Sequence, residues 1–358
     1  MMIEEFQVAK NSLSKTRTVR RPAPALQPGE VLARVDRFAL TANNITYGVV
    51  GERIGYWKFF PADDGFGIIP VWGFADVVES ASPDIEPGER LYGYFPMATH
   101  LVLKPGKVAK ERLLDVSAHR SDLPTVYNSY ARVRAEAHFD PAMEDLRMLL
   151  FPLYATSFCL FDFLIDNKWF GAEQALIVSA SSKTAIGLAY ALKADRASPR
   201  RVGLTSARNA ERVKSLRLYD DVVTYDEMSA IDIARKTVII DMSGDGKVLS
   251  RLHTLLGDNM RYTSNVGVTH YEAAGMGPGF IKERSAMFFA PGHIQKRSAD
   301  WGPGVFERKA FEFWKDAAAK SVSWLTFDRR AGFEAIGPAY LEALAGSTPP
   351  DRGLVISV

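Results

Sequence analysis

A short polar turn carries the residues of this chain whose types and spacing suit phosphate binding. An apolar run at residues 175 to 178 precedes the turn, and from Thr184 onward apolar residues recur with helical spacing. Because the turn has no bulky apolar side chain, its backbone amides can point outward at the start of a helix, where a phosphate binds. The candidate phosphate-binding residues are Ser179, Ser181, Ser182, Lys183 and Thr184.

The turn departs from the glycine-rich form of this motif. Only Gly187 stands at one of the three spaced glycine positions, and serine and alanine occupy the earlier ones. Considered alone, the stretch is explained equally well by an ordinary connection between a strand and a helix.

Two further apolar runs end in small or polar residues. Thr205, Ser206 and Arg208 follow one of them, and residues 241 to 244, which include Ser243, follow the other. In a parallel sheet the carboxyl ends of the strands lie at one edge, and that edge binds the ligand. Three polar strand ends together favour a dinucleotide site.

The end of the second strand discriminates between the two nicotinamide dinucleotides. A carboxylate there usually binds the ribose 2′-hydroxyl of NAD, whereas the 2′-phosphate of NADP needs hydrogen-bond donors and positive charge. This strand is followed by no acid until Glu211, and Arg208 supplies a cation. We therefore expect NADP(H); an exposed charge at the start of a helix is the alternative role for Arg208.

A second polar cluster lies near the N-terminus. Asn43, Asn44, Thr46 and Tyr47 come close together in the sequence, and an aromatic cluster follows at residues 56 to 60. Such a loop can line a pocket for a flat or apolar substrate. Turn formation and packing over a barrel core explain the same residues equally well.

These candidates belong to two different patterns of secondary structure. Up to about residue 125, short strands at 31–36, 71–80 and 97–103 alternate with Pro-Gly turns, which indicates a β-barrel or sandwich. From 175 to 268, strands alternate with helices, which indicates βαβ units and a parallel sheet.

The connecting segments are predicted as follows. Residues 115–141 form an irregular arm, and residues 143–166 are helical with either a break or a new first turn at Pro152, since proline lacks the backbone N–H that a helix interior uses. Near the C-terminus we expect a helix at 306–320 and a strand at 322–327.

Length and charge exclude several function classes. The 358 residues suggest two domains, and 44 basic against 42 acidic residues leave a net charge of +2, too small to attract nucleic acid. Apolar runs such as residues 148 to 153 are much shorter than the roughly 20 residues of a membrane span, and the first residues do not resemble a signal peptide. We expect a soluble, cytoplasmic protein that binds neither nucleic acid nor a membrane.

A bound metal is not expected. The single cysteine, Cys159, excludes an internal disulfide and a multi-thiolate site, and the six histidines lack the short spacings of a zinc motif. Any chemistry would therefore depend on an organic cofactor.

Several stretches resemble one enzyme superfamily in their order and spacing. They include Pro-Gly-Glu-Val-Leu-Ala-Arg-Val from Pro28, Leu-Thr-Ala-Asn-Asn from Leu40, Gly-Phe-Ala-Asp-Val-Val-Glu-Ser from Gly73 and Pro-Gly-Glu-Arg-Leu-Tyr-Gly from Pro87. Together with the strand, turn and helix described above, they resemble the medium-chain dehydrogenase/reductase superfamily, in its zinc-independent quinone-reductase and enoyl-reductase branch. Segments that match poorly indicate a separate subgroup.

The resemblance implies both a fold and an activity. The fold would be α/β, with a GroES-like β-barrel domain at residues 1–150 and 305–358 and a Rossmann-type domain, a doubly wound parallel sheet, at residues 151–304. The activity would be hydride transfer from NADPH to a quinone or an α,β-unsaturated carbonyl small molecule, and the protein could form a homodimer.

The same resemblance implies residue roles. Asn44 matches a polar pocket position, and Tyr47 or Tyr56 would donate a proton to the substrate. A tyrosine with the ordinary pKa of about 10 is protonated at neutral pH and can donate a hydrogen bond. The residues that would contact the cofactor in addition to the strand-end residues named above are Thr156, Tyr225 and Asn265.

Two other functions fit the same sequence. An NADP(H)-binding sensor or scaffold protein would bind the dinucleotide without turnover. A thioester-linked enoyl reductase of lipid or polyketide assembly would carry a long apolar channel through residues 56–72 and 287–306.

Overall fold

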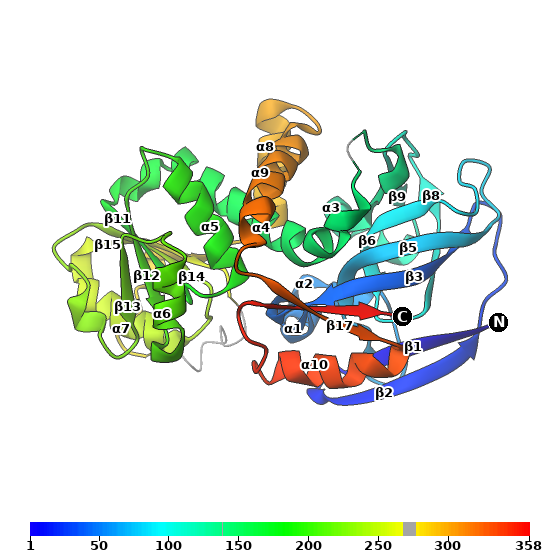
Figure 1. Ribbon diagram of the computed structural model, residues 1–358, viewed down its shortest axis with the longest axis horizontal. Coiled ribbons are helices and arrows are strands. Elements are labelled where there is room, and N and C mark those ends of the chain that lie inside the picture. Colours follow the sequence, from blue (N-terminus) through cyan, green and yellow to red (C-terminus); the bar gives the residue numbers. More distant parts are fainter. Residues whose placement is uncertain (138, 268–276) are drawn as a thin grey trace. The chain divides into compact units, whose positions relative to one another are not determined.

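The computed structural model describes residues 1–137, 139–267 and 277–358. The chain divides into two compact units (Figure 1). Unit 1 comprises Met1–Leu149 and Leu325–Val358, and unit 2 comprises Leu150–Trp324.

The second boundary between the units lies at Leu325 and not at residue 305 as the sequence predicted. The helices α8 (Ala290–Trp301) and α9 (Val305–Ser321) belong to unit 2. They pack on α4 (Glu144–Asp166): Phe306 and Ala310 of α9 form a buried cluster with Cys159 of α4. A contact between amino acids far apart in sequence therefore fixes this boundary, and the local pattern does not reveal it.

Unit 1 is a β structure, as its alternating short strands predicted. One sheet has the order β2-β1-β4, and a nine-stranded sheet has the order β17-β18-β3-β5-β6-β10-β9-β8, with β7 paired to β3. The strands are β1 (Met2–Ala9), β2 (Ser12–Pro22), β3 (Val31–Leu40), β4 (Phe66–Gly67), β5 (Pro70–Ser80), β6 (Arg90–Pro96), β7 (His100–Leu103), β8 (Pro105–Gly106), β9 (Arg112–Asp115), β10 (Ser129–Arg132), β17 (Thr326–Ala331) and β18 (Arg352–Ser357).

Two expectations for unit 1 need correction. The segment 115–141 is not wholly irregular, because β10 enters the large sheet between β6 and β9. The strand expected at 322–327 is β17, which begins at Thr326, because α9 continues to Ser321. The remaining helices of the unit are α1 (Ala42–Val49), α2 (Gly51–Ile54), α3 (Thr125–Asn128) and α10 (Ile336–Leu344), with several short 3-10 turns, among them η1 (Tyr56–Lys58).

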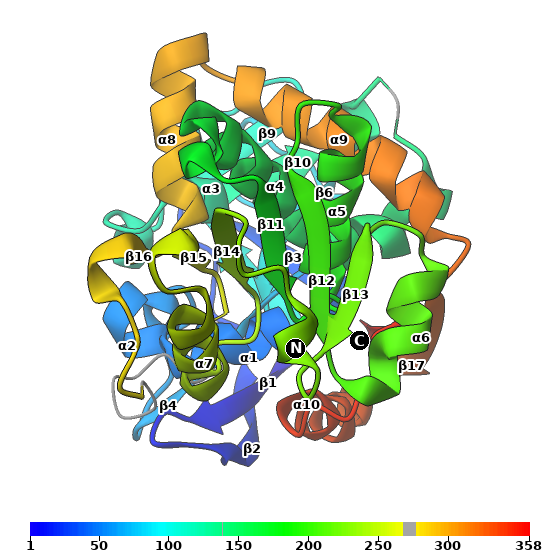
Figure 2. The ribbon, with the colours of Figure 1, turned by 90° about the vertical axis from the view of Figure 1, so that its left-hand side faces the viewer.

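Unit 2 is built on a six-stranded parallel sheet with the order β13-β12-β11-β14-β15-β16, and Figure 2 shows its strands side by side. Numbered within the unit, this is the strand order 3-2-1-4-5-6 of the doubly wound dinucleotide-binding fold. The predicted fold class is thus confirmed. Its elements are β11 (Gln174–Val178), α5 (Lys183–Ala194), β12 (Arg200–Thr205), α6 (Ala207–Ser215), β13 (Asp221–Thr224), β14 (Thr237–Asp241), α7 (Gly246–Leu256), β15 (Met260–Asn265) and β16 (Ser285–Met287).

The sheet of unit 2 is buried on both faces. On one face Leu249 and Leu252 of α7 pack with Leu176 of β11. On the other, Leu160 of α4 and Leu188 of α5 form a second apolar cluster. The two central strands, β11 and β14, therefore contain uninterrupted apolar runs, as expected for a parallel sheet covered by helices on both sides. The alternating pattern predicted for residues 175–268 closes with β15, which ends at Asn265; Val268 lies outside the described residues.

Helix α4 continues through Pro152, where the sequence predicted a break or a new first turn. Proline removes one helical hydrogen bond, but burial of the flanking turns holds the helix together: Leu150 and Leu160 are fully buried. By length and composition alone, the stretch Pro141–Asp166 is long and apolar enough to cross a membrane. Half of its most apolar part is buried inside the protein, and the core helix of a globular domain has the same length and composition.

A buried histidine joins α7 to β15 and to the segment that follows residue 277. Ile281 N donates to His253 Nδ1 at 2.9 Å, and His253 Nε2 lies 2.9 Å from Thr263 Oγ1. Because a backbone N–H can only donate, Nδ1 carries no proton, and the neutral ring donates from Nε2. Burial, assisted by the nearby positive charge of Arg284, lowers the pKa of His253 to about 4.

The free energy of unfolding should therefore fall in mild acid. Since the pKa of His253 is about 4 when folded and about 6.5 when unfolded, the unfolded chain binds the extra proton between these values. Stability is complete above pH 6.5 and declines as the pH falls toward 4. We expect a loss of about 2 kcal/mol from this residue between pH 7 and pH 5. Urea unfolding at both pH values measures it.

The matched variant is His253→Gln, which retains polar atoms but does not titrate in this range. It should be less stable than the wild-type protein at pH 7 and should lose correspondingly less on acidification. If both proteins lose the same free energy between pH 7 and pH 5, His253 does not control the acid sensitivity.

Candidate functional site

The carboxyl ends of four strands meet at one edge of the unit 2 sheet. In the strand register, Val178 pairs with both Leu204 and Asp241, and Asp241 pairs with Asn265. The predicted residues that follow these strand ends are therefore placed along one edge. The neighbours β11 and β14 form the point at which the strand order reverses, which is where doubly wound sheets bind their ligands.

The turn after β11 keeps the backbone shape of a glycine without having one. Ser179 has a φ of 59°, in the left-handed region. That conformation costs a non-glycine residue on the order of 1 kcal/mol. Ser182 N donates to Ser179 O at 2.9 Å, and Ser182 caps α5 by accepting from Ala185 N at 3.3 Å. A serine therefore holds the tight turn that the glycine fingerprint usually provides.

This turn presents backbone donors at the start of α5. Within the described residues, the amides of Ser181 and Thr184 have no hydrogen-bond acceptor. Gly187 allows α5 to approach α4 closely, because a Cβ there would lie 2.6 Å from Ser157 Oγ. The turn and the close helix contact together are suited to holding a phosphate group at the helix N-terminus.

The end of β12 carries a polar group with no partner. Ser206 Oγ is buried and has no hydrogen-bond partner among the described residues. Arg208 is exposed and forms no ion pair within the described part of the chain. Asn209, which the sequence analysis missed, donates from Nδ2 to Ser181 Oγ at 3.1 Å and so links this loop to the turn after β11. Its position three residues after Ser206 was the only available signal.

Thr205 and Tyr225 shape the same region. Thr205 is buried, and its carbonyl accepts from Tyr225 N at 3.0 Å. Burial raises the pKa of Tyr225, and hydrogen bonding with Ser179 opposes that rise. Tyr225 therefore contacts the residue with the left-handed backbone and supports the turn directly.

The loop after β14 is held by a buried carboxylate that the sequence analysis did not single out. Asp241 accepts from Ser243 N at 2.9 Å, from Ser243 Oγ at 2.6 Å and from Gly244 N at 3.0 Å. Burial raises the pKa of Asp241, and these hydrogen bonds oppose the rise. The Ser243 hydroxyl also accepts from Asp245 N at 3.1 Å, so it helps to fix the loop at this edge.

The other predicted cofactor residues lie on neighbouring elements of unit 2. Thr156 is on α4 and donates from Oγ1 to Pro152 O at 3.0 Å. Asn265 ends β15, is buried, and donates from Nδ2 to Ala286 O at 3.3 Å. Lys183 and Thr184 form the first turn of α5. Within the described ranges, no group of three His, Cys, Asp or Glu side chains is arranged to hold a metal.

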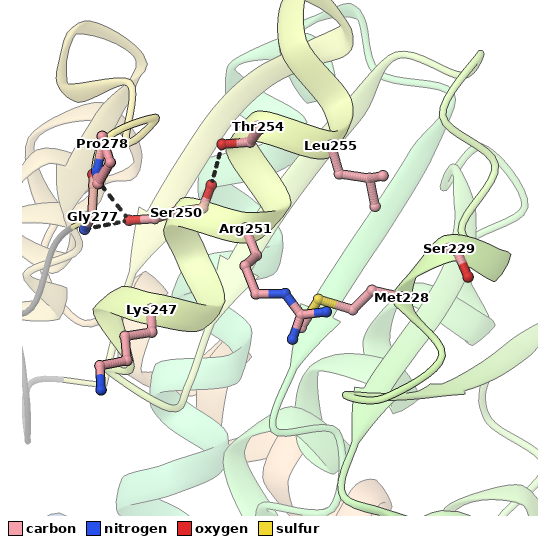
Figure 3. A pocket seen from close by; sticks show the side chains of 9 residues that line it. All are labelled: Met228, Ser229, Lys247, Ser250, Arg251, Thr254, Leu255, Gly277 and Pro278. Atoms are coloured by element: carbon pink, nitrogen blue, oxygen red, sulfur yellow. Dashed lines mark hydrogen bonds between the residues drawn. The ribbon is translucent and has the colours of Figure 1, made fainter.

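A cavity of about 550 Å³ lies beside α7 in unit 2 (Figure 3). Lys247 and Arg251 extend from α7, and Arg251 points toward Met228. No predicted cofactor residue lines this cavity. The cavity and the candidate cofactor site at the strand ends therefore share no residues.

In unit 1, Asn44 has a structural position at the start of α1. Its Oδ1 accepts from Thr41 N at 2.8 Å, which completes a capping box, and its Nδ2 donates to Pro70 O at 2.9 Å. The side chain is 3% exposed. These contacts tie α1 to β5 and hold the following turns of the helix in place.

Tyr47 and Tyr56 lie together in an aromatic cluster. Their ring centroids are 4.5 Å apart, and both residues are buried. Asn43 Nδ2 donates to the Tyr47 hydroxyl oxygen at 2.6 Å, and the hydroxyls of Tyr56 and Tyr127 are 3.0 Å apart. The other rings of the cluster are Phe59, Trp72, Tyr92, Tyr94 and Tyr127. Tyr127 and Trp72 were not predicted as site residues, because separate strands and turns bring them to this position.

The two units together define the fold. A GroES-like β unit combined with a six-stranded Rossmann unit is the fold of the medium-chain dehydrogenase/reductase superfamily, as the resemblance implied. Within that fold, the chain belongs to the family described as protein of unknown function DUF2855, whose model matches residues 38–349. No curated protein matches the sequence.

Solved structures with the same fold align along essentially the whole chain. CurA from Vibrio vulnificus is 12% identical, with a TM-score of 0.63 and coverage of 100% of this chain and 99% of that one. TarJ from S. aureus in complex with NADPH is 10% identical, with a TM-score of 0.61 and the same coverage. The quinone oxidoreductase from Coxiella burnetii is 13% identical, with a TM-score of 0.57 and full coverage of both chains. At these identities the likeness shows the fold.

Proposed function

We propose that the protein is an NADPH-dependent oxidoreductase that reduces a quinone or an α,β-unsaturated carbonyl compound. The observation that carries this proposal is the end of β12, where Ser206 Oγ is buried without a partner and Arg208 has no ion pair within the described residues. A phosphate on the adenosine ribose would satisfy both groups. Support comes from CurA and TarJ, since both of those proteins are known in complex with NADPH.

The residues present fit this cofactor. The amides of Ser181 and Thr184 would bind the pyrophosphate at the N-terminus of α5. Ser206 and Arg208 would bind the 2′-phosphate, and Thr156 and Asn265 would lie on the nicotinamide side. When bound, NADPH supplies the hydride for the reduction.

The aromatic cluster of unit 1 would serve the substrate. Its flat rings suit a planar conjugated carbonyl compound, and its hydroxyl groups can donate hydrogen bonds to a carbonyl oxygen. Burial raises the pKa of both Tyr47 and Tyr56, so both are protonated at neutral pH and are able to give a proton. Asn44 would position α1, which carries Tyr47.

Calorimetric titration with NADPH and NADH tests the proposal first. We expect NADPH to bind more tightly than NADH. The absorbance of bound NADPH should then fall when naphthoquinone or cyclohexenone is added. If neither NADPH nor NADH binds, the proposed function is wrong. If NADPH binds but no quinone or enone oxidises it, the protein is a sensor instead.

Replacing Arg208 should change cofactor preference. In Arg208→Ala, one charge-assisted contact with the 2′-phosphate is lost, which is worth about 1.5–3 kcal/mol. We expect the Kd for NADPH to rise by roughly 10- to 100-fold, while the Kd for NADH changes little. Calorimetry on both cofactors measures the two effects.

A matched control is Arg196→Ala. Arg196 is also exposed, but it precedes β12 and so lies at the amino end of the strand. Its replacement should leave both affinities unchanged. Equal losses for NADPH and NADH in Arg208→Ala would contradict the phosphate assignment.

A further inference from the structure

The Tyr47 hydroxyl has an unusual set of partners. Helix α1 places Asn43 and Tyr47 four residues apart on one face, and Asn43 Nδ2 donates to the Tyr47 oxygen at 2.6 Å. From β5, Trp72 Nε1 donates to the same oxygen at 3.4 Å. Both groups are N–H donors, and an indole N–H has no acceptor function. The Tyr47 oxygen therefore receives these two hydrogen bonds, and neither Asn43 nor Trp72 takes the proton of Tyr47. The Tyr94 hydroxyl also interacts with Tyr47 as a donor, because this contact lowers the pKa of Tyr47 and raises that of Tyr94.

Tyr56 differs from Tyr47 in this respect. Its hydroxyl lies 3.0 Å from that of Tyr127, and either group can be the donor. Tyr56 and Tyr127 can thus satisfy each other, since a hydroxyl both donates and accepts. The two candidate tyrosines are almost equally buried, at 5% and 6% exposure, so burial does not distinguish them but hydrogen bonding does.

We propose that Tyr47 is the residue that hydrogen-bonds to the carbonyl oxygen of the substrate and gives it a proton, and that Asn43 and Trp72 are positioning residues that orient Tyr47 and stabilise its phenolate. The inference rests on the proposed reduction of a conjugated carbonyl compound. It selects one tyrosine and adds two residues from α1 and β5 that the sequence did not assign.

Tyr47 would transfer its proton to the substrate during the reduction. In the reduction, the substrate would gain a hydride supplied by NADPH, which would be oxidised to NADP⁺, and an electron pair moves onto the carbonyl oxygen of the substrate. The O–H bond of Tyr47 breaks, a new O–H bond forms on the substrate, and the negative charge passes to the Tyr47 oxygen. The N–H groups of Asn43 and Trp72 already point at that oxygen, so the charge develops where donors are in place. Water then returns a proton to Tyr47.

The electrostatics of the cluster agree with this role. Burial is the largest influence on Tyr47 and raises its pKa, with Tyr56 adding to the rise, while hydrogen bonds from Trp72, Asn43 and Tyr94 oppose it. Tyr47 therefore stays protonated at neutral pH, and its donors reduce the cost of the phenolate.

The first experiment compares Tyr47→Phe with Tyr56→Phe in the full-length protein, with NADPH and either naphthoquinone or cyclohexenone. Loss of a general acid should lower kcat by roughly 10²- to 10⁴-fold in Tyr47→Phe. Tyr56→Phe should lower it by less than about 10-fold, the value of one ordinary hydrogen bond. The affinity for NADPH should remain unchanged in both variants. A larger loss in Tyr56→Phe would overturn the assignment while leaving the proposed function intact.

The second experiment tests the donors. Asn43→Asp keeps the size of the side chain but replaces its donor with acceptors, which would bind the Tyr47 proton and withhold it from the substrate. We expect kcat to fall further in Asn43→Asp than in Asn43→Ala, and by about 10-fold in Trp72→Phe, which keeps an aromatic ring but lacks the N–H. If Asn43 only filled space, the isosteric Asp variant would be the milder one, and this result would overturn the positioning role.

A binding measurement without cofactor separates the inference from turnover. Quenching of tryptophan fluorescence follows the binding of naphthoquinone, with naphthalene as a probe of similar shape that lacks the carbonyl oxygens. Tyr47→Phe should weaken naphthoquinone binding by roughly 3- to 10-fold and leave naphthalene binding unchanged. If the wild-type protein oxidises no NADPH, the proposed function fails. If Tyr47→Phe binds both probes as the wild-type protein does, the inference fails.

Discussion

Replacing Arg120 with leucine should lower the free energy of unfolding by about 3–5 kcal/mol. Arg120 and Asp115 form an ion pair at 2.8 Å in which each side chain is only 1% exposed. Leucine would fill part of the space but would leave the Asp115 carboxylate buried without its counter-charge. Breaking a buried pair from one side is costly because the remaining charge is neither solvated nor neutralised.

The environment of Arg120 increases the expected loss. Its guanidinium also donates to the Tyr130 hydroxyl at 2.9 Å and to Phe59 O at 3.3 Å, and it lies 4.7 Å from the ring centroid of Phe60. The variant would therefore lose several contacts in the core of unit 1. Urea unfolding followed by fluorescence measures the change.

Two control variants test whether burial of the ion pair causes the loss of stability in Arg120→Leu. Arg200→Leu removes an ion pair with Asp221 in which both side chains are more than 40% exposed, and we expect it to leave the free energy of unfolding almost unchanged, because solvent screens an exposed pair. Replacing both Arg120 and Asp115 with leucine should recover stability relative to Arg120→Leu, since no uncompensated charge remains. A cost of Arg120→Leu as small as that of Arg200→Leu would show that the buried carboxylate finds another partner.

Arg120 also bears on the proposed substrate cluster. The Phe59 ring lies 5.1 Å from Tyr94 and 5.5 Å from Tyr127, measured between ring centroids. The buried Arg120 guanidinium donates to Phe59 O and so stabilises the segment that carries Tyr56. We expect a stability variant at Arg120 to lower reductase activity as well, so activity in this variant must be interpreted together with its stability.

Much of the fold could be predicted from local patterns. Alternating short strands with Pro-Gly turns indicated unit 1, and strands alternating with helices indicated the parallel sheet of unit 2, because each pattern reflects which faces are buried. The prediction failed where distant contacts decide the structure. Burial keeps α4 helical through Pro152, and packing against Cys159 assigns α9 to unit 2.

The candidate site was only partly accessible from sequence. The turn at Ser179 was predicted to bind phosphate because small and polar residues follow a buried strand. Its left-handed backbone could not be predicted, because serine rarely adopts this conformation. Asn44 looked like a pocket residue, yet its amide completes a helix cap. The hydroxyl partners of the tyrosines could not be predicted, because Trp72 and Tyr127 come from elements far from Tyr47 in sequence.

Replacing Gly187 with alanine should destabilise unit 2 by about 3 kcal/mol, the upper end of the usual cost of overpacking a core. The added Cβ would lie 2.6 Å from Ser157 Oγ and 2.6 Å from Tyr154 Cδ1. Neither neighbour can move easily: Ser157 Oγ donates to Thr184 O at 2.7 Å, and the Tyr154 hydroxyl is 2.7 Å from Ser321 Oγ. Helix α5 would therefore have to shift away from α4.

A shift of α5 should also weaken the binding of NADPH, because the turn at Ser179 leads directly into this helix. Gly292→Ala is the matched control: Gly292 lies in α8, and among the described residues an added Cβ would meet Phe289 Cδ1 alone, at 3.8 Å. Since alanine favours a helix over glycine by up to about 1 kcal/mol, this control should be neutral or stabilising. Thermal unfolding with and without NADPH compares the two. Gly187→Ala should have both a lower Tm and a smaller rise in Tm with NADPH, whereas a normal rise would mean that the phosphate-binding turn does not depend on the contact between α4 and α5.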